Sequence, residues 1–133
     1  MGKKKKILII EDDDSQAQAL AAFLEAKDYK VFQAFSGETG LDLIQTELPD
    51  LILLDVFLPG EDGLAILKRL KRQTDPNTGE PSKTHHIPII ILTGKGDMME
   101  EVFEMEEAFA FFKKPYEPQT LLLSIQRALE SKT

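Results

Sequence analysis

Four apolar stretches of the sequence each end on polar residues that could do chemistry. Three of these ends offer carboxylate or hydroxyl oxygens, and the fourth offers two ammonium groups. In chain order the end residues are Glu11, Asp12 and Asp13, then Asp55, then Thr93, then Lys113 and Lys114. Carboxylates crowded together repel one another unless a cation lies among them. Such a set suits a hard divalent ion, above all Mg2+, which prefers oxygen ligands and retains some of its water.

The same residue types suit phosphoryl transfer to a carboxylate, a reaction in which positioning and charge neutralisation supply most of the catalysis. An ammonium group such as that of Lys114 can hold a phosphoryl oxygen, and the hydroxyl of Thr93 can donate a hydrogen bond to one. The sequence places no histidine beside a nucleophile to serve as its general base, so it does not predict a hydrolase.

Each of these pieces also has a purely structural interpretation. The acidic triplet could be a helix N-cap and first turn, where negative charge opposes the helix dipole. Thr93 and Gly94 could form a turn, and Lys114 and Pro115 could end a strand. These interpretations do not predict that all four polar groups follow equivalent strands, which is why we favour a site.

The elements that must position the polar residues alternate between strand and helix patterns. Short apolar runs, typical of strands covered on both faces of a parallel sheet, predict five strands. They span residues 7–10, 30–35, 51–54, 87–92 and 109–112. Helical spacing of apolar residues follows each strand, with Asp14 or Ser15 as the predicted cap of the first helix and Pro118 at the start of the last.

Strict alternation of strands and helices predicts an α/β fold. We expect a doubly wound, five-stranded parallel sheet of the flavodoxin-like order 2-1-3-4-5, with helices on both faces. Ligands of such sheets bind outside the carboxyl ends of the strands, near the switch in strand order. Strands one, three, four and five are neighbours in this order. We therefore expect one crevice shared by Glu11, Asp12, Asp55, Thr93 and Lys114.

Length and composition predict one domain at residues 7–131, preceded by a basic tail at 1–6. No apolar run reaches the length of a membrane span or of a signal-peptide core, and cysteine is absent, so we expect a cytoplasmic protein without a membrane partner. The net charge of −7 disfavours nucleic acid as a partner. We interpret the lysines at 3–6 as a solvated tail.

One predicted connection, at residues 73–86, is long and rich in turn residues, which indicates a surface loop. His85 and His86 end this loop without acidic or cysteine companions at ligand spacing. We interpret them as loop residues rather than metal ligands.

In combination, four motifs resemble the receiver domain of two-component response regulators, in particular the single-domain chemotaxis type. They are ILIIEDDD, LILLDVFLPGEDG, IIILTGKGD and FFKKPYEP, and the resemblance covers nearly the whole chain. It implies a phosphorylation-dependent signalling switch that accepts a phosphoryl group from a sensor histidine kinase or a phosphotransfer protein and then signals by protein contact. It also implies no enzymatic activity beyond the chain's own phosphorylation and dephosphorylation.

The resemblance implies roles for the residues of the acidic motifs. Asp55 would be the phospho-acceptor. Glu11, Asp12 and Asp55 would hold Mg2+, and Phe57, two residues after the acceptor, would add its backbone carbonyl as a ligand.

The resemblance also implies roles for the later motifs. Thr93 looks like the switch hydroxyl, and Lys114 looks like the phosphate-contacting lysine, with a cis bond to Pro115. Phe111 occupies the place of the aromatic switch residue. It lacks the hydroxyl that many relatives carry there, so its switching would rest on packing alone.

The downstream partner is expected on the face formed by the fourth helix, the fifth strand and the last helix. Four apolar residues of the fourth-helix region could contribute to that face, although core packing is favoured for at least two of them. They are Met98, Met99, Phe103 and Met105. No output domain is expected after the last helix.

Two alternatives belong to other functional classes. A pseudo-receiver would use the same fold as an interaction module without phosphorylation, but such forms usually lack one of the key residues. A flavodoxin-like nucleotide binder would share the sheet order, but no glycine-rich phosphate loop follows the first strand and tryptophan is absent for flavin stacking.

Overall fold

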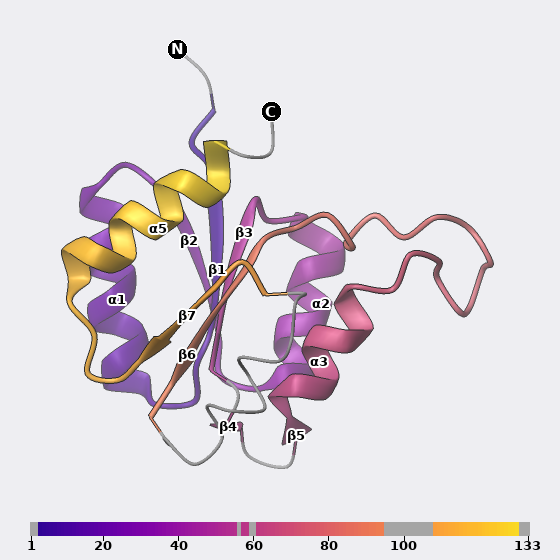
Figure 1. The fold of residues 1–133 in the computed structure, drawn as a ribbon, viewed down its shortest axis with the longest axis horizontal. Coiled ribbons are helices and arrows are strands. Elements are labelled where there is room, and N and C mark those ends of the chain that lie inside the picture. Colours follow the sequence, from indigo (N-terminus) through magenta and orange to yellow (C-terminus); the bar gives the residue numbers. More distant parts are fainter. Residues whose placement is uncertain (1–2, 56, 59–60, 95–107, 131–133) are drawn as a thin grey trace.

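The five predicted strands form one parallel sheet in a computed structural model of the protein (Figure 1). The structure describes residues 3–55, 57–58, 61–94 and 108–130. The strands are β1 (Lys6–Ile10), β2 (Lys30–Ala34), β3 (Leu51–Asp55), β6 (Ile89–Thr93) and β7 (Ala110–Lys113). Their order across the sheet is β2-β1-β3-β6-β7, which confirms the predicted order 2-1-3-4-5.

Helices cover both faces of the sheet (Figure 1). They are α1 (Asp14–Ala26), α2 (Gly37–Glu47), α3 (Gly63–Leu70) and α5 (Pro118–Glu130). Helices α1 and α5 lie on one face, and α2 and α3 lie on the other. A short antiparallel ribbon, β4 (Phe57–Leu58) with β5 (Glu61–Asp62), connects β3 to α3. Within the described part of the chain, no helix has the length and apolar character needed to cross a membrane.

The central strands are buried on both faces because their side chains alternate between two apolar layers. In β1, Ile7 and Ile9 pack toward α1 and α5, whereas Leu8 and Ile10 pack toward α2 and α3. Every residue of β3 and β6 is buried. Full burial stabilises each such aliphatic side chain by about 1.5–3 kcal/mol. The strands are therefore firmly held, and so are the positions of the polar residues at their ends.

The first helix begins at a different cap from the predicted Asp14 or Ser15. Asp13 is the N-cap of α1: its backbone is extended, and its side chain accepts a hydrogen bond from the backbone N–H of Gln16 at 2.9 Å. Asp14 lies in the first turn instead, where its negative charge opposes the helix dipole. The prediction that α5 begins at Pro118 is confirmed.

The fourth strand begins at Ile89 rather than at residue 87, because Pro88 has no N–H to donate to the sheet. The Pro88 carbonyl still accepts a hydrogen bond from the Ile52 N–H at 3.0 Å, while Ile87 closes a turn onto Thr84. The first strand begins one residue earlier than predicted, at Lys6. Strand β2 ends one residue earlier than predicted, β3 ends one residue later, and β7 is shifted by one residue at both ends. The division into a basic tail and a domain stays a prediction.

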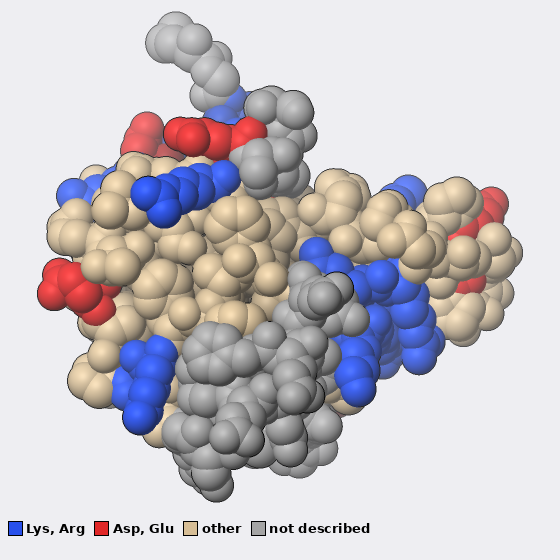
Figure 2. All heavy atoms as spheres, in the orientation of Figure 1, with Lys and Arg blue, Asp and Glu red and all other residues tan. Residues whose placement is uncertain are grey.

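The predicted long loop extends away from the sheet beyond α3 (Figure 1). It contains no helix or strand, only an isolated bridge between Thr74 and Pro81. The Lys71 ammonium donates hydrogen bonds to the carbonyls of His85 and Ile87, which holds the returning end of the loop beside α3. Figure 2 shows basic side chains gathered next to this loop.

Candidate functional site

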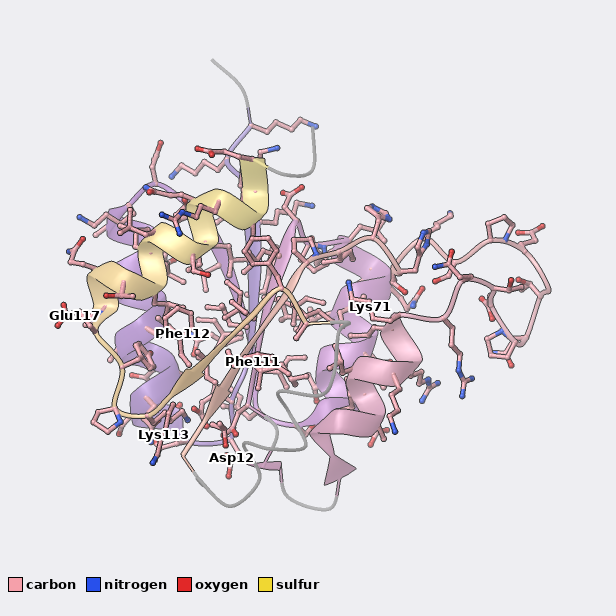
Figure 3. All side chains as sticks on the ribbon, viewed as in Figure 1. Asp12, Lys71, Phe111, Phe112, Lys113 and Glu117 are labelled. Atoms are coloured by element: carbon pink, nitrogen blue, oxygen red, sulfur yellow. The ribbon has the colours of Figure 1, made fainter. Side chains whose placement is uncertain are left out.

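Three carboxylates converge at the carboxyl ends of β1 and β3. Glu11 directly follows β1 and Asp55 ends β3, and these strands are neighbours with Ile10 opposite Leu54. Carboxylate oxygens of Glu11, Asp12 and Asp55 all lie within 4.8 Å of one another. Glu11 and Asp55 are buried, with 5% and 6% of their surface exposed, whereas Asp12 is exposed at the rim of the sheet (Figure 3). The predicted grouping of these residues is confirmed.

Lys114 follows the edge strand β7, and its side chain reaches this acidic cluster. Its ammonium forms an ion pair with Glu11 and lies 3.5 Å from an oxygen of Asp55. The neighbouring Lys113 belongs to β7, pairs in register with Thr93, and is exposed. The structure therefore places Lys114, not Lys113, in the carboxylate pocket. The predicted cis bond between Lys114 and Pro115 is also present.

Thr93 ends β6, between the strands that supply Asp55 and Lys114. Its backbone carbonyl accepts a hydrogen bond from the Lys114 N–H at 2.7 Å, and the residue is fully buried. Alternation along β6 places the Thr93 side chain on the same face of the sheet as Ile91. The prediction that Thr93 lies at the same end of the sheet as the carboxylates is confirmed.

Phe111 and Phe112 point to opposite faces of the sheet from β7 (Figure 3). Phe111 lies opposite Ile91 and packs against the core layer below α2 and α3, whereas Phe112 packs toward α1 and α5. Phe111 is only half-buried. It therefore shares a sheet face with Thr93 and retains contact with the surface.

Burial and unequal charge set the electrostatics of the pocket. Burial is the largest cause that raises the pKa of Glu11 above its ordinary value, and Asp55 raises it further, although the hydrogen bond from Lys114 and one from the Asp13 N–H lower it. Burial acts to lower the pKa of Lys114, but the hydrogen bond to Glu11 and the charge of Asp55 outweigh it and raise this pKa. The two pKa values rise for different reasons: burial dominates for Glu11, whereas two neighbouring carboxylates dominate for Lys114.

The pocket consequently has more negative than positive charge, with three carboxylates around one ammonium. All three acidic side chains offer hard oxygen donors, and Asp12 is accessible from solvent. A divalent cation of the Mg2+ type fits such a set. Across the ranges that the structure describes, these three residues form the sole group of three or more close carboxylate, histidine or cysteine ligands. The contribution of the Phe57 carbonyl stays a prediction.

Tyr116, two residues after Lys114, is not among the predicted site residues. Burial raises the pKa of Tyr116. The charge of Lys114 opposes that rise and the charge of Glu11 adds to it, so the phenol interacts electrostatically with the pocket. Tyr116 also lines an apolar groove of about 220 Å³ between α1 and the start of α5, together with Phe23 and Pro118. The signal in the sequence was an aromatic residue directly after the Lys114-Pro115 pair. It carries no periodicity that would reveal its burial.

The predicted output face is described only in part. The apolar residues of the fourth-helix region, namely Met98, Met99, Phe103 and Met105, lie outside the described residues. Strand β7 and helix α5 are described; Phe109, the residue before β7, is 42% exposed, and Leu123 in α5 is 55% exposed.

The fold is a doubly wound, five-stranded parallel sheet of the receiver type. An acidic cluster and a lysine lie at the carboxyl ends of its strands. The sequence matches the family model of the response regulator receiver domain over residues 7–126. The chain therefore belongs to the receiver domains of two-component response regulators.

Similar proteins include longer regulators. The chain is 37% identical to the transcriptional regulatory protein AfsQ1 of Streptomyces coelicolor over 124 residues, which cover 92% of this chain and 50% of AfsQ1. It is 34% identical to the response regulator PleD of Caulobacter vibrioides over 124 residues, which cover 91% of this chain and 25% of PleD. The chain thus spans half or less of these curated relatives.

Two solved structures of receiver domain proteins share the fold over nearly their whole length. A response regulator receiver domain protein from Clostridium thermocellum has 30% identity and a TM-score of 0.82, with 96% of each chain covered. A CheY-like receiver domain protein from Methanospirillum hungatei JF-1 has 28% identity and a TM-score of 0.79, with 96% of this chain and 95% of that chain covered.

Proposed function

We propose that this chain is a phosphorylation-dependent signalling switch in which Asp55 accepts the phosphoryl group. The observation that carries the proposal is the position of Asp55, which ends a fully buried strand and lies 3.5 Å from the Lys114 ammonium and beside two further carboxylates. Burying a carboxylate is costly, and crowding three together adds repulsion. Fold stability alone does not account for this arrangement, whereas phosphoryl transfer does.

The proposed donor is a phosphohistidine on a sensor histidine kinase or a phosphotransfer protein. An oxygen of Asp55 forms a bond to phosphorus while the bond between phosphorus and the histidine nitrogen breaks. The electron pair leaves with the imidazole, which takes up a proton. Lys114 is placed to hold an oxygen of the new acyl phosphate. We propose no enzymatic activity on other substrates, only the chain's own phosphorylation and its reversal by water.

Mg2+ is the proposed cofactor, held by Glu11, Asp12 and Asp55 and by the backbone carbonyl of Phe57. When bound, it neutralises charge that develops on the transferring group. Glu11 and Asp55 are held in place by the buried ends of β1 and β3, and Asp12 can adjust at the rim. The excess of carboxylates over ammonium groups in the pocket supports this proposal.

Thr93 and Phe111 are the proposed switch residues. A phosphoryl group on Asp55 offers acceptor oxygens that draw the Thr93 hydroxyl inward, and Phe111, on the same face of the sheet, moves into the space released. Because Phe111 has no hydroxyl, its position depends on packing alone. Repacking here would alter the surface of β7 and α5. We propose that a protein partner in the cytoplasm reads that surface, without a role for nucleic acid or membrane.

The experiment that tests the proposal is Mg2+-dependent phosphorylation by acetyl phosphate, read by intact-protein mass spectrometry as the addition of one phosphoryl group. The Asp55→Asn variant should gain none. A matched control is Asp28→Asn, because Asp28 lies in an exposed turn with φ 73°, a conformation that asparagine tolerates. This control should be phosphorylated as fully as the unsubstituted protein.

The pseudo-receiver alternative gives the opposite results. It predicts no Mg2+-dependent mass increase in the unsubstituted protein, and identical binding to partners with and without beryllofluoride, a phosphate mimic. Labelling of Asp55→Asn to the level of the control would instead assign the acceptor role to another residue.

A further inference from the structure

The carboxyl-terminal end of α3 carries a compact group of basic side chains. We call Lys68, Arg69 and Arg72 the α3 basic patch; all three are exposed. They stand out because the chain as a whole has a net charge of −7. Figure 2 shows basic side chains, in blue, gathered on the right of the molecule beside the long loop. Among the ion pairs found between described residues, none involves a member of this patch.

A cavity of about 350 Å³ opens next to the patch, between α2, the end of α3 and the long loop. Arg69 and Arg72 line it, and the side-chain amides of Gln45 and Asn77 add neutral donors. Two carboxylates also line it. Asp75 is occupied within the loop, where it accepts a hydrogen bond from the Asn77 N–H at 2.8 Å, and Asp42 is exposed on α2.

The loop that forms one wall of the cavity is tied together by hydrogen bonds. Asp75 N–H donates to the Glu80 carbonyl at 2.8 Å, and Ser82 N–H donates to the Gln73 carbonyl at 2.9 Å. The buried Thr84 hydroxyl donates to the carbonyl of Leu70, the last residue of α3, at 3.2 Å. Together with the Lys71 hydrogen bonds, these contacts fix the loop against α3. The cavity is therefore a built feature of the surface.

We propose that this cavity and the α3 basic patch bind an acidic segment of a partner protein. Arginine presents a planar fork that matches a carboxylate in two hydrogen bonds, and Arg69 and Arg72 offer two such forks at one opening. Spaced carboxylates of a peptide can pair with them and avoid Asp42. A nucleic-acid backbone, with its continuous charge, meets repulsion from Asp42 and from the acidic remainder of the chain.

This surface is separate from the acidic pocket. Helix α3 begins near the β4–β5 ribbon, at the end of the sheet where Asp55 lies, and runs away from it, so the patch lies at the distant end of α3 (Figure 1). Binding of the acidic segment therefore does not require the phosphoryl group, and the Asp55→Asn variant should bind it unchanged. Failure of this inference and failure of the proposed phosphorylation are thus distinguishable.

The test is fluorescence anisotropy at low salt with a labelled octapeptide of alternating aspartate and glutamate as the probe. The double variant Arg69→Gln/Arg72→Gln should weaken binding about fivefold, because two exposed ion pairs are worth about 1 kcal/mol together. A matched control is Lys3→Gln/Lys4→Gln, which removes the same charge from the exposed amino-terminal lysines. It should change the affinity less than about twofold. Replacing both arginines by lysine should give an intermediate loss, because charge remains but the fork is gone.

Three outcomes would overturn the inference. Equal weakening by Arg69→Gln/Arg72→Gln and by the control Lys3→Gln/Lys4→Gln would show that the peptide responds to net charge alone. Equal binding of the matched asparagine and glutamine octapeptide would remove the role of carboxylates. Tighter binding of a single-stranded oligonucleotide, lost in the arginine variant, would assign the patch to nucleic acid instead.

Discussion

The ammonium of Lys114 lies 3.5 Å from a carboxylate oxygen of Asp55, although β6 lies between β7, which precedes Lys114, and β3, which ends at Asp55. Lys114 follows the edge strand β7, and its side chain passes the end of β6 to reach β3. The same ammonium also contacts Glu11, at the end of β1. One lysine thus compensates carboxylates from two strands, and this pairing underlies the predictions below.

Lys114→Gln should lower the free energy of unfolding of the metal-free protein by about 1–3 kcal/mol, because it leaves two buried carboxylates without their cation. Urea denaturation in the presence of EDTA measures the change. Lys113→Gln is the matched control, since Lys113 is the exposed neighbour, and it should stay within about 0.5 kcal/mol of the unsubstituted protein. Equal effects of the two substitutions would show that the pairing with Glu11 and Asp55 contributes nothing.

Mg2+ at about 100 times its dissociation constant should raise the free energy of unfolding by about 2.7 kcal/mol, because the folded protein alone holds the assembled carboxylates. Thermal unfolding with and without Mg2+ measures this gain. Asp12→Asn should remove most of it. Asp14→Asn, in the same acidic run but outside the cluster, should retain it. A full Mg2+ response in Asp12→Asn would exclude Asp12 as a ligand.

The raised pKa of Glu11 predicts a pH dependence of stability in the metal-free protein. Because the folded-state pKa lies above the ordinary value of 4.5, the folded protein binds the Glu11 proton more tightly than the unfolded chain does. The associated stability is present below pH 4.5 and is lost as the pH rises through the folded-state pKa. Chemical denaturation across this range should therefore show Glu11→Gln gaining stability relative to the unsubstituted protein. A relative loss with rising pH would reverse the assigned direction.

Gly40→Ala should destabilise the protein, because α2 packs closely on β1. The overpacking should cost about 1–3 kcal/mol, which outweighs the gain of about 1 kcal/mol from the higher helix propensity of alanine. A Cβ atom at Gly40 would lie 2.6 Å from Cδ1 and 2.9 Å from Cγ1 of Ile10, the residue just before Glu11. Ile10→Val removes that Cδ1 atom. The double variant should therefore lose less stability than the sum of the single variants, as measured by urea denaturation. Strict additivity would show that the Cδ1 contact does not contribute to the loss of stability.

The positions of the strands and the polar residue at each strand end were predictable from sequence, because both are local patterns. A buried parallel strand needs a run such as Leu51–Leu54 on consecutive positions, and its end is marked where Asp55 interrupts the run. Alternation with helices then leaves few possible sheet orders. The four-motif resemblance added which polar residue would have which role, including the preference for Lys114 over Lys113.

What sequence could not supply depends on side chains that meet from distant parts of the chain. Asp12 joins the carboxylate cluster as predicted, but the cap of α1 is Asp13 rather than the predicted Asp14 or Ser15, because the exact residue at which the chain turns into the helix depends on packing. The burial of Tyr116 and the cavity beside Arg69 likewise depend on how helices and the long loop pack. Local periodicity carries no information about such packing, so these features emerged only once the sheet and its covering helices were assembled.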